Sequence, residues 1–400
     1  MAVLRGSSSV VEMTRMIDYG FLQFTPPSAP LGHRSGYLRD MSQNTLGTLL
    51  RLTTFGESHG PAIGGLLDGM PAGLSLDLNA VQHQLSRRRP GQSELTSPRK
   101  EKDELEVLSG LFEGKTTGAP IAFIIRNTDQ KPKDYSQIKD VFRPSHADYV
   151  FEQKYGLRDY RGGGRSSARV TAPIVAGGAM AAQLLVNEGV RISAYVQRVG
   201  EVESLTAADQ LDMDQVDAHP TRCPDPNVQG YMESAIRQAQ QDGDTLGGAI
   251  QCVANDVPVG WGAPVFQKLH AQLAQVMMGI NAAKAFEMGS GIQGTYRKGS
   301  EENDVFQHSD GRIRTITNHS GGIQGGISNG EPVQFKVHFK PIATLMQDQS
   351  SVDKEGQSVT IEGKGRHDPC VVPRAVPIVE ALAALVLADA MLQSRTDKMG

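Results

Sequence analysis

The sequence GLRDYRGGGRSSARVT, residues 156–171, places four arginines around three consecutive glycines and opposes them with one acid, Asp159. Glycine has no Cβ, so the backbone can adopt unusual turns and a ligand can approach its N–H groups closely. Ser166 and Ser167 precede an apolar, alanine-rich run and are expected to cap a helix, whose N-terminus favours an anion. The stretch therefore predicts a site for a phosphate or a carboxylate, with a solvated basic turn as the alternative.

The composition is that of an ordinary globular protein. The 400 residues are 39% hydrophobic and carry a formal net charge of −4, which argues against a general nucleic-acid binder. Cys223, Cys252 and Cys370 lack the C-x-x-C spacing of a zinc site, so we expect a reducing, cytoplasmic compartment and no metal. No apolar run approaches the roughly 18 residues that a membrane-spanning helix needs.

Residues 1–40 differ from the rest of the chain. They contain a run of serines at 7–9 and prolines at 26, 27 and 30, with no apolar segment long enough for a secretory signal. We interpret 1–40 as an N-terminal extension, either disordered or an artefact of start-codon assignment, with an organelle transit peptide as a weaker alternative. Residues 41–400 are expected to form a single catalytic domain.

Strand and helix patterns alternate along this domain, which indicates a mixed α and β protein. The expected strands cover residues 45–54, 120–125, 191–198, 247–254 and 333–339. The expected helices cover residues 79–89, 171–188, 230–241, 265–286 and 375–393. The last of these helices is apolar nearly all round, which predicts that it is buried.

Three adjacent arginines, residues 87–89, end the first expected helix. On a helix they point about 100° apart, and only Arg88 continues the apolar stripe of Val81 and Leu85. A charge on the buried face needs a partner, so Arg88 is the candidate ligand-binding residue. Arg87 and Arg89 are expected to face solvent.

Two histidines and one carboxylate lie in segments with local constraints, and of these His59 taken alone is more often structural than catalytic. His59 lies in a glycine-flanked turn beside Ser58, but neighbouring residues cannot form a hydrolase triad because their side chains point apart. His146 is ten residues from the start of the arginine-glycine stretch. Asp368 is held extended by the proline that follows it, and its alternative role is a salt bridge with Arg366.

Two nucleotide-binding patterns are excluded by their context. The segment from Gly110 to Thr116 has three residues between its glycines where a P-loop has four. The glycines at 289, 291 and 294 match a dinucleotide fingerprint but follow an expected helix instead of a strand.

Seven motifs in this order resemble the chorismate synthase family. They are TTFGESHG (53–60), RRRPGQ (87–92), NTDQ (127–130), RPSHADY (143–149), GLRDYRGGGRSSAR (156–169), SGGIQGGISNG (320–330) and GRHDPC (365–370). The resemblance covers nearly the whole chain after the extension. It implies an α+β fold, a layered β-α-β sandwich in which helices pack between antiparallel sheets, and a homotetramer. It also implies a lyase that converts 5-enolpyruvylshikimate-3-phosphate to chorismate by losing phosphate and a C6 hydrogen.

The resemblance further implies a required reduced FMN, with no net redox change, and roles for particular residues. His59, His146 and Asp368 match the catalytic positions. The positions that match flavin contacts are Arg165, Ser166, Ser167, Asn281, Ala282, Gly325, Lys340, Pro341, Ile342, Ala343, Thr344 and Arg366. Those that match contacts to the phosphate of the substrate or of NADP are Ser58, Arg88, Arg161 and Arg169.

One position departs from the family pattern. Glu94 stands where many bacterial relatives carry an arginine, which puts NADPH binding near Arg88 in doubt, and Arg99 or Lys100 are the candidate replacements. NADPH is then an indirect reductant, and a separate flavin reductase is the expected partner. Two other functions stay open at this point: an NAD(P)H-dependent flavin reductase, and a non-catalytic anion- or RNA-binding protein.

Overall fold

The computed structural model describes residues 44–92, 95–96, 102–128, 138–309, 311–363 and 368–398. The chain divides into two units, Met1–Ser42 and Gln43–Gly400, of which the second contains all of the described residues. The predicted extension, residues 1–40, lies outside the described residues.

The first sheet is antiparallel and has the strand order β1-β2-β3-β7-β4. Its strands are β1 (Thr45–Leu46), β2 (Arg51–Gly56), β3 (Ala62–Asp68), β7 (Ile121–Arg126) and β4 (Leu105–Val107). Its buried side chains come from alternate positions of the strands, as a half-buried sheet requires.

The single strand expected over 45–54 is wrong, because the chain reverses between β1 and β2. The carboxylate of Asp389 accepts hydrogen bonds from the N–H groups of Thr48, Leu49 and Leu50 at 2.9, 2.7 and 2.9 Å. These bonds satisfy a turn whose N–H groups would otherwise lack ladder partners. The sequence alone does not show a partner more than 300 residues away.

The second sheet is also antiparallel, with the order β10-β9-β11-β17-β12. Its strands are β10 (Val202–Glu203), β9 (Arg191–Val199), β11 (Gly248–Asn255), β17 (Val333–Phe339) and β12 (Ala283–Met288). The strict alternation of buried and half-buried residues along β17 matches its predicted bounds.

The long helix expected over 265–286 is wrong. Helix α5 covers only Leu269–Met278, and β12 follows it. Gly279 ends the helix and Ala282 has a φ of 69°, a left-handed conformation that a continuous helix cannot contain. The segment that follows pairs with β17, so tertiary pairing outweighs the helix propensity of its alanines.

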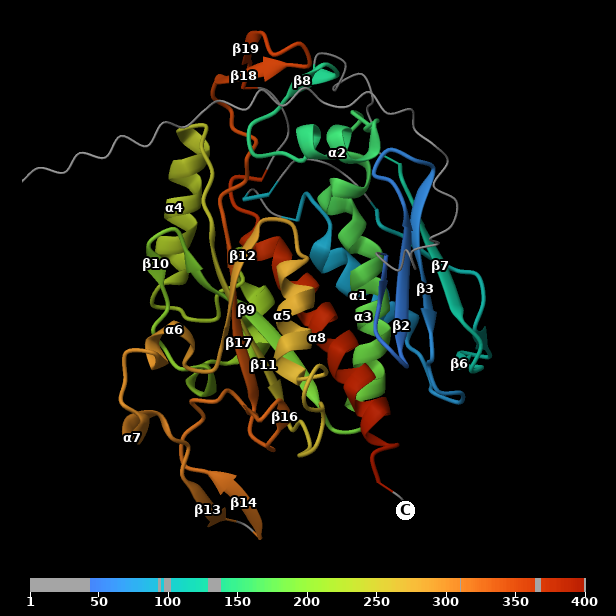
Figure 1. Ribbon diagram of the computed structural model, residues 1–400, viewed down its shortest axis with the longest axis vertical. Helices are drawn as coiled ribbons and strands as arrows, with labels where there is room; N and C mark the ends of the chain where they lie inside the picture. The colour runs from blue at the N-terminus through green and yellow to red at the C-terminus, as the bar shows by residue number, and fades with distance from the viewer. Residues whose placement is uncertain are drawn as a thin grey trace, which may run out of the picture. The chain divides into compact units, whose positions relative to one another are not determined.

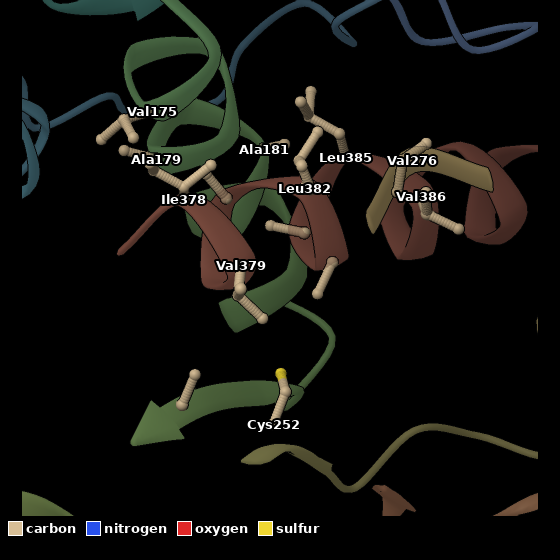
Figure 2. Packing of buried hydrophobic residues seen from close by; sticks show 14 of the residues in the cluster. Val175, Ala179, Ala181, Cys252, Val276, Ile378, Val379, Leu382, Leu385 and Val386 are labelled. Carbon is tan, nitrogen blue, oxygen red and sulfur yellow. The ribbon is translucent and has the colours of Figure 1, made fainter. Parts of the chain in front are cut away.

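Helices α1 (Leu78–Arg88), α3 (Thr171–Val186) and α8 (Val372–Ser394) lie between the two sheets together with α5 (Figure 1). Helix α3 packs against β3 and α8 packs against β9 and β11. Figure 2 shows Val175 and Ala179 of α3 beside Ile378 of α8, and Val379 of α8 facing Cys252 of β11. The fold is therefore α+β, with helices between antiparallel sheets as expected.

Two of these helices are long and apolar enough to cross a membrane by length and composition alone. They cover Ala168–Val186 and Val372–Ser394, longer than the apolar runs inferred from the sequence. In each helix we consider the most apolar stretch of 18 residues. In the structure 67% of this stretch is buried in the first helix and 89% in the second. Both are core helices of this fold.

The other elements surround this core. Helices α2 (Asp148–Tyr155), α4 (Gln229–Gln241), α6 (Gly291–Gly294) and α7 (Gly299–Glu302) are short or peripheral. Small sheets are formed by β5 (Leu111–Phe112) with β6 (Lys115–Thr116), β13 (Phe306–Ser309) with β14 (Arg312–Thr315), and β15 (Ile323–Gln324) with β16 (Ile327–Ser328). A fourth small sheet joins β8 (Val141–Phe142), β18 (Gln349–Asp353) and β19 (Ser358–Ile361).

Candidate active site

A cavity of about 460 Å³ lies where loops from several distant segments meet the ends of α1 and α8. Most residues that the sequence motifs single out line it. These are Ser58, His59, Arg88, His146, Ser166, Ser167, Arg169, Asn281, Ala282, Lys340, Ile342, Ala343, Thr344 and Asp368. The fold therefore brings five of the seven motifs to one place, together with residues 281–282 and the segment 340–344.

Four of the predicted residues do not line this cavity in the described part of the chain: Arg161, Arg165, Gly325 and Pro341. Arg161 is exposed and pairs with Asp159 at 2.9 Å. Arg165 donates to Asn44 Oδ1 at 2.9 Å and to the backbone oxygen of Gly56 at 3.2 Å. Arg366 lies outside the described residues.

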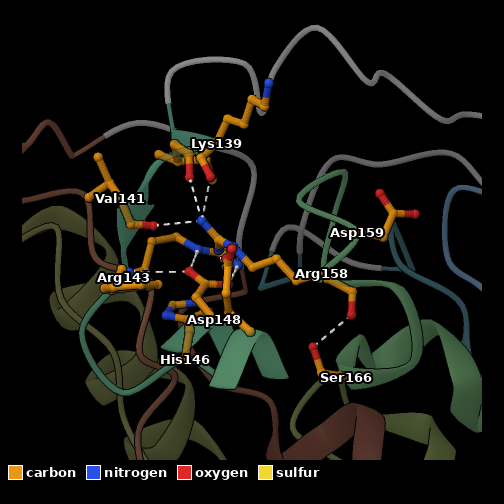
Figure 3. A network of polar contacts seen from close by, with 12 residues as sticks. Lys139, Val141, Arg143, His146, Asp148, Arg158, Asp159 and Ser166 are labelled. Atoms are coloured by element: carbon orange, nitrogen blue, oxygen red, sulfur yellow. Dashed lines mark hydrogen bonds and ion pairs between the residues drawn. The ribbon is translucent and has the colours of Figure 1, made fainter. Parts of the chain in front are cut away.

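The arginine-glycine stretch only partly forms the expected anion site. Arg158 is buried and pairs with Asp148 and Glu152, and its Nη2 donates to three backbone carbonyls (Figure 3). Of the four arginines in this stretch, Arg169 alone is among the described residues that line the cavity. Ser167 caps a short 3₁₀ turn over Ala168–Val170, so the expected capping of the α-helix itself is wrong.

His59 is oriented by the glycine loop. The Ser58 hydroxyl donates to the carbonyl oxygen of Gly162 at 3.2 Å, and Ser58 Oγ lies 3.0 Å from His59 Nδ1. Because the single hydroxyl hydrogen goes to that carbonyl, His59 donates its Nδ1 hydrogen to Ser58. In the neutral ring Nε2 is then the basic nitrogen.

Gly162 is required by geometry at this point. Its φ of 70° is one that residues with a Cβ rarely adopt, and a Cβ built there would lie 2.1 Å from His59 Cε1. No side chain fits without moving the imidazole ring. The glycine run therefore sets the position of His59 as well as opening the loop.

The tautomer of His146 is also fixed by the hydrogen-bond partner of its Nδ1. Its Nδ1 lies 3.0 Å from the carbonyl oxygen of Pro144, which can only accept, so Nδ1 carries the hydrogen. Its Nε2 lies 2.9 Å from Thr344 Oγ1 and accepts that hydroxyl hydrogen when the ring is neutral. Burial, followed by the positive charge of Arg143, lowers the pKa of His146 below its usual value.

A buried group of charges forms one wall of the cavity. The carboxylate of Asp103 pairs with Arg88 at 2.6 Å and also with Arg169, and its side chain is fully buried. Burial alone would raise the pKa of Asp103, but the charges of Arg88 and Arg169 outweigh it and hold the pKa at about 2. Both arginines therefore keep a fixed counter-ion behind the cavity.

The wall still has capacity to bind an anion. Among the described lining residues, the basic side chains are Arg88, Arg143, Arg169, Lys340 and Arg374, and the one carboxylate is Asp368. Arg88 Nε is buried and has no hydrogen-bond partner in the described part of the chain. A buried donor without a partner costs about 1–3 kcal/mol, so a bound acceptor at this point would be favourable.

Comparison with known proteins gives the family. A model of the chorismate synthase family matches residues 50–392. The chain belongs to this family. It is 57% identical over 359 residues to the chorismate synthase of Christiangramia forsetii, covering 90% of this chain and 100% of that protein.

Further relatives agree. The chorismate synthase of Cytophaga hutchinsonii is 53% identical over 89% of this chain and 99% of its own length. A solved structure entitled "Crystal Structure of Chorismate Synthase" matches with a TM-score of 0.70 and 31% identity, covering 87% of this chain and 93% of that one. The resemblance of the motifs to chorismate synthases is therefore confirmed. The arrangement of helices between antiparallel sheets agrees with the solved structure of a chorismate synthase.

Two residues at this cavity, one behind its wall and one lining it, carry no clear local signal in the sequence. Asp103 lies in the charged run KEKDE, residues 100–104, which is typical of a solvated surface segment. Its φ of 50° and its two arginine partners are visible only in three dimensions. Arg374 was also missed, although it follows the GRHDPC motif by four residues on the first turn of α8, where it pairs with Asp368.

The prediction that Arg87 faces solvent is wrong. Arg87 is buried, pairs with Glu380 of α8 and lies 2.7 Å from Asp217, whereas Arg89 is exposed as predicted. The last turn of α1 is enclosed on two sides, so two of its three arginines are covered. The apolar stripe of a helix shows which face packs on the core, but it does not show that a second face is also covered.

Replacing Arg87 by alanine is therefore expected to lower the free energy of unfolding by about 1.5–3 kcal/mol, because Glu380 loses its charged hydrogen-bond partner. The matched control is Arg89→Ala, which removes the exposed neighbour and should change stability little. Urea unfolding of both variants beside the wild type measures the difference. Equal stability of the two variants would contradict this account of the helix end.

Proposed function

We propose that this protein converts 5-enolpyruvylshikimate-3-phosphate to chorismate by the anti-1,4-elimination of phosphate and a C6 hydrogen, without net redox change. The observation that carries the proposal is the shared cavity. His59, His146 and Asp368 come from three distant segments and line one cavity together with several basic side chains. Such a site suits a substrate with one phosphate and two carboxylates, since arginine and lysine form charge-assisted hydrogen bonds with these groups.

The cavity also suits reduced FMN. Its volume falls in the range of small-molecule sites, and it combines apolar side chains with backbone and cationic groups. Ser166, Ser167, Asn281, Ala282 and the segment 340–344 would hold the cofactor. Lys340 donates to its neighbour's carbonyl at 3.1 Å and has no ion-pair partner within the described ranges, which leaves its charge for a phosphate. Reduced FMN bound there would supply electron density to the substrate and an acceptor for the C6 hydrogen.

The protein's own residues then have separate tasks. Arg88 and Arg169, held by Asp103, bind the phosphate group and stabilise its growing charge as it leaves. His59, once Nε2 has taken up a proton so that both ring nitrogens carry hydrogen, delivers that proton to the departing phosphate oxygen. His146 would hold the protonation state of a bound cofactor through its Nε2, in exchange for the present bond to Thr344 Oγ1, and Asp368 would accept or return a proton beside it.

The remaining parts of the proposal concern partners. NADPH acts indirectly, through a separate flavin reductase, and the enzyme is a cytoplasmic homotetramer. Glu94, Arg99 and Lys100, the residues on which direct NADPH binding depends, lie outside the described residues. Arg88 is committed to Asp103 and the cavity, which supports a role in the substrate site over a separate nucleotide site.

The affinity for anionic ligands is expected to depend on His146. Its lowered pKa keeps the ring neutral near pH 7, and a bound anion would raise that pKa, so binding should take up a proton. Affinity should therefore increase as pH falls from the pKa of the complex toward the pKa of the free protein, and level off outside that window. Titration of FMN by calorimetry, in buffers with different ionisation enthalpies, measures the proton uptake.

The control for this experiment is His146→Asn, which removes the titrating ring. Ligand phosphates ionise in the same pH range, so the informative quantity is the proton uptake of the wild type minus that of the variant. A difference near zero would contradict the role given to His146.

The direct test of the proposed function is an anaerobic assay. The protein is mixed with 5-enolpyruvylshikimate-3-phosphate and photoreduced FMN, and inorganic phosphate and chorismate are measured. We expect equal amounts of both products. Phosphate without chorismate would instead indicate simple hydrolysis and would reject the proposal.

A further inference from the structure

Arg222 occupies an unusual position behind the cavity. It lies between the 3₁₀ turn Met213–Ala218 and α4, only 7% of its surface is exposed, and it is not among the described residues that line the cavity. Its φ of 56° is left-handed, a conformation that costs a residue with a Cβ about 1–3 kcal/mol. Strain of this kind persists where surrounding contacts hold the residue, so its contacts need an explanation.

The guanidinium group of Arg222 binds two helices at once. Nη2 donates to the carbonyl oxygen of Arg87, in the last turn of α1, at 2.7 Å. Nη1 donates to the carbonyl oxygen of Pro373, in the first turn of α8, also at 2.7 Å. Nε lies 2.9 Å from Asp217, which fixes the plane of the fork.

Neither carbonyl can receive the ordinary helical hydrogen bond from the residue four positions later. Arg87 is so close to the end of α1 that its carbonyl lies beyond the helical hydrogen-bond ladder. The carbonyl of Pro373 would normally accept from residue 377, but that residue is Pro377, which has no N–H. Arg222 thus donates to a carbonyl that a helix end exposes on one side and to one that a proline exposes on the other. The side chain of Gln92 also donates to the Arg87 carbonyl and accepts from Arg222 Nη2 at 2.7 Å.

Both carbonyls belong to residues that precede cavity arginines. Arg88 follows Arg87, and Arg374 follows Pro373. Arg374 also donates from Nε to the carbonyl oxygen of Arg88 at 3.2 Å. The two cavity arginines are therefore carried on backbone segments that Arg222 ties together from behind.

We propose that Arg222 is a positioning residue that holds Arg88, which binds the phosphate group of the substrate, in a fixed place relative to Arg374, the ion-pair partner of Asp368. The proposal rests on the function given above. Burial, followed by the charge of Arg87, lowers the pKa of Arg222 to about 10, so the group stays protonated near neutral pH. The hydrogen bonds from Arg222 to the two carbonyls therefore persist over the pH range in which His146 titrates.

The test is Arg222→Lys, which keeps the positive charge but cannot donate to both carbonyls in one plane. We expect the dissociation constant for inorganic phosphate to rise about tenfold, and the substrate KM to rise with it, because the two arginines lose their common orientation. The control is Arg198→Lys, which removes an arginine bond to the Gly200 carbonyl away from the cavity and should change neither value more than about twofold. Both variants are measured at a temperature well below their melting transitions.

The outcomes separate the roles. A normal phosphate dissociation constant and KM in folded Arg222→Lys, with only a lower melting temperature, would make Arg222 a structural residue and overturn the proposal. An equal rise of the phosphate dissociation constant and KM in the Arg198→Lys control would also overturn the proposal. A wild type that binds phosphate but forms no chorismate would reject the proposed function while leaving the phosphate-binding comparison valid.

Discussion

Replacing Asp368 by asparagine is expected to slow phosphate release in a single turnover by about 10²–10⁴-fold, the usual contribution of a general acid–base group. Asp368 is 7% exposed and lines the cavity with both candidate histidines. The amide keeps the shape of the carboxyl group but cannot accept a proton. Substrate and FMN affinities should change much less than the rate.

The structure sharpens the competing interpretation of Asp368. Its ion-pair partner is Arg374 on α8, while Arg366, the partner considered from the sequence, lies outside the described residues. If Asp368 only holds Arg374, the variant should melt at a lower temperature and release phosphate at the normal rate. Asp225→Asn is the matched control, because Asp225 is equally buried but bonds to Ser204 and Thr206 away from the cavity.

Replacing Asp103 by alanine is expected to lower the free energy of unfolding by about 3–5 kcal/mol, because it leaves Arg88 and Arg169 buried without their shared counter-ion. The pKa of Asp103 is about 2 in the folded protein, against an ordinary value of 3.8. A carboxyl group with a depressed folded pKa stabilises the protein above its unfolded pKa. The stabilisation is thus complete above about pH 4 and is lost as the pH falls toward 2.

Asp68→Ala is the control for this prediction. Asp68 pairs with Arg51 at 2.7 Å on an exposed part of β3, where an ion pair contributes about 0–1 kcal/mol. Urea unfolding at pH 7 compares the two variants. A similar loss of unfolding free energy in both variants would contradict the view that Asp103 is an essential counter-ion for the two buried arginines.

Local sequence patterns predicted most elements of the core. The β17 strand and the α3 and α8 helices match because their apolar patterns are long and agree with their burial. The errors occurred where distant contacts decide the structure. Residues 45–54 form a hairpin held by Asp389, and residues 283–288 form a strand because they pair with β17.

The same holds for the site: residues in local motifs were predicted, and residues that depend on distant partners were not. Local motifs predicted His59, His146 and Asp368, and helical phase predicted Arg88; all four line the cavity. Asp103 and Arg222 act through partners far along the chain, and no local pattern marks them. Helical phase also distinguished Arg88 from Arg89, but failed for Arg87, because phase cannot show that Glu380 of another helix lies beside it.

The central claim is that the flavin is recycled while the substrate loses phosphate. The most direct measurement is the number of NADPH molecules oxidised per phosphate released, with catalytic FMN and a separate reductase present under anaerobic conditions. The account predicts many phosphates per FMN and a ratio of NADPH to phosphate close to zero once the flavin is reduced. One NADPH oxidised for each phosphate, or steady NADPH oxidation by the protein alone without substrate, would contradict it and indicate a flavin reductase.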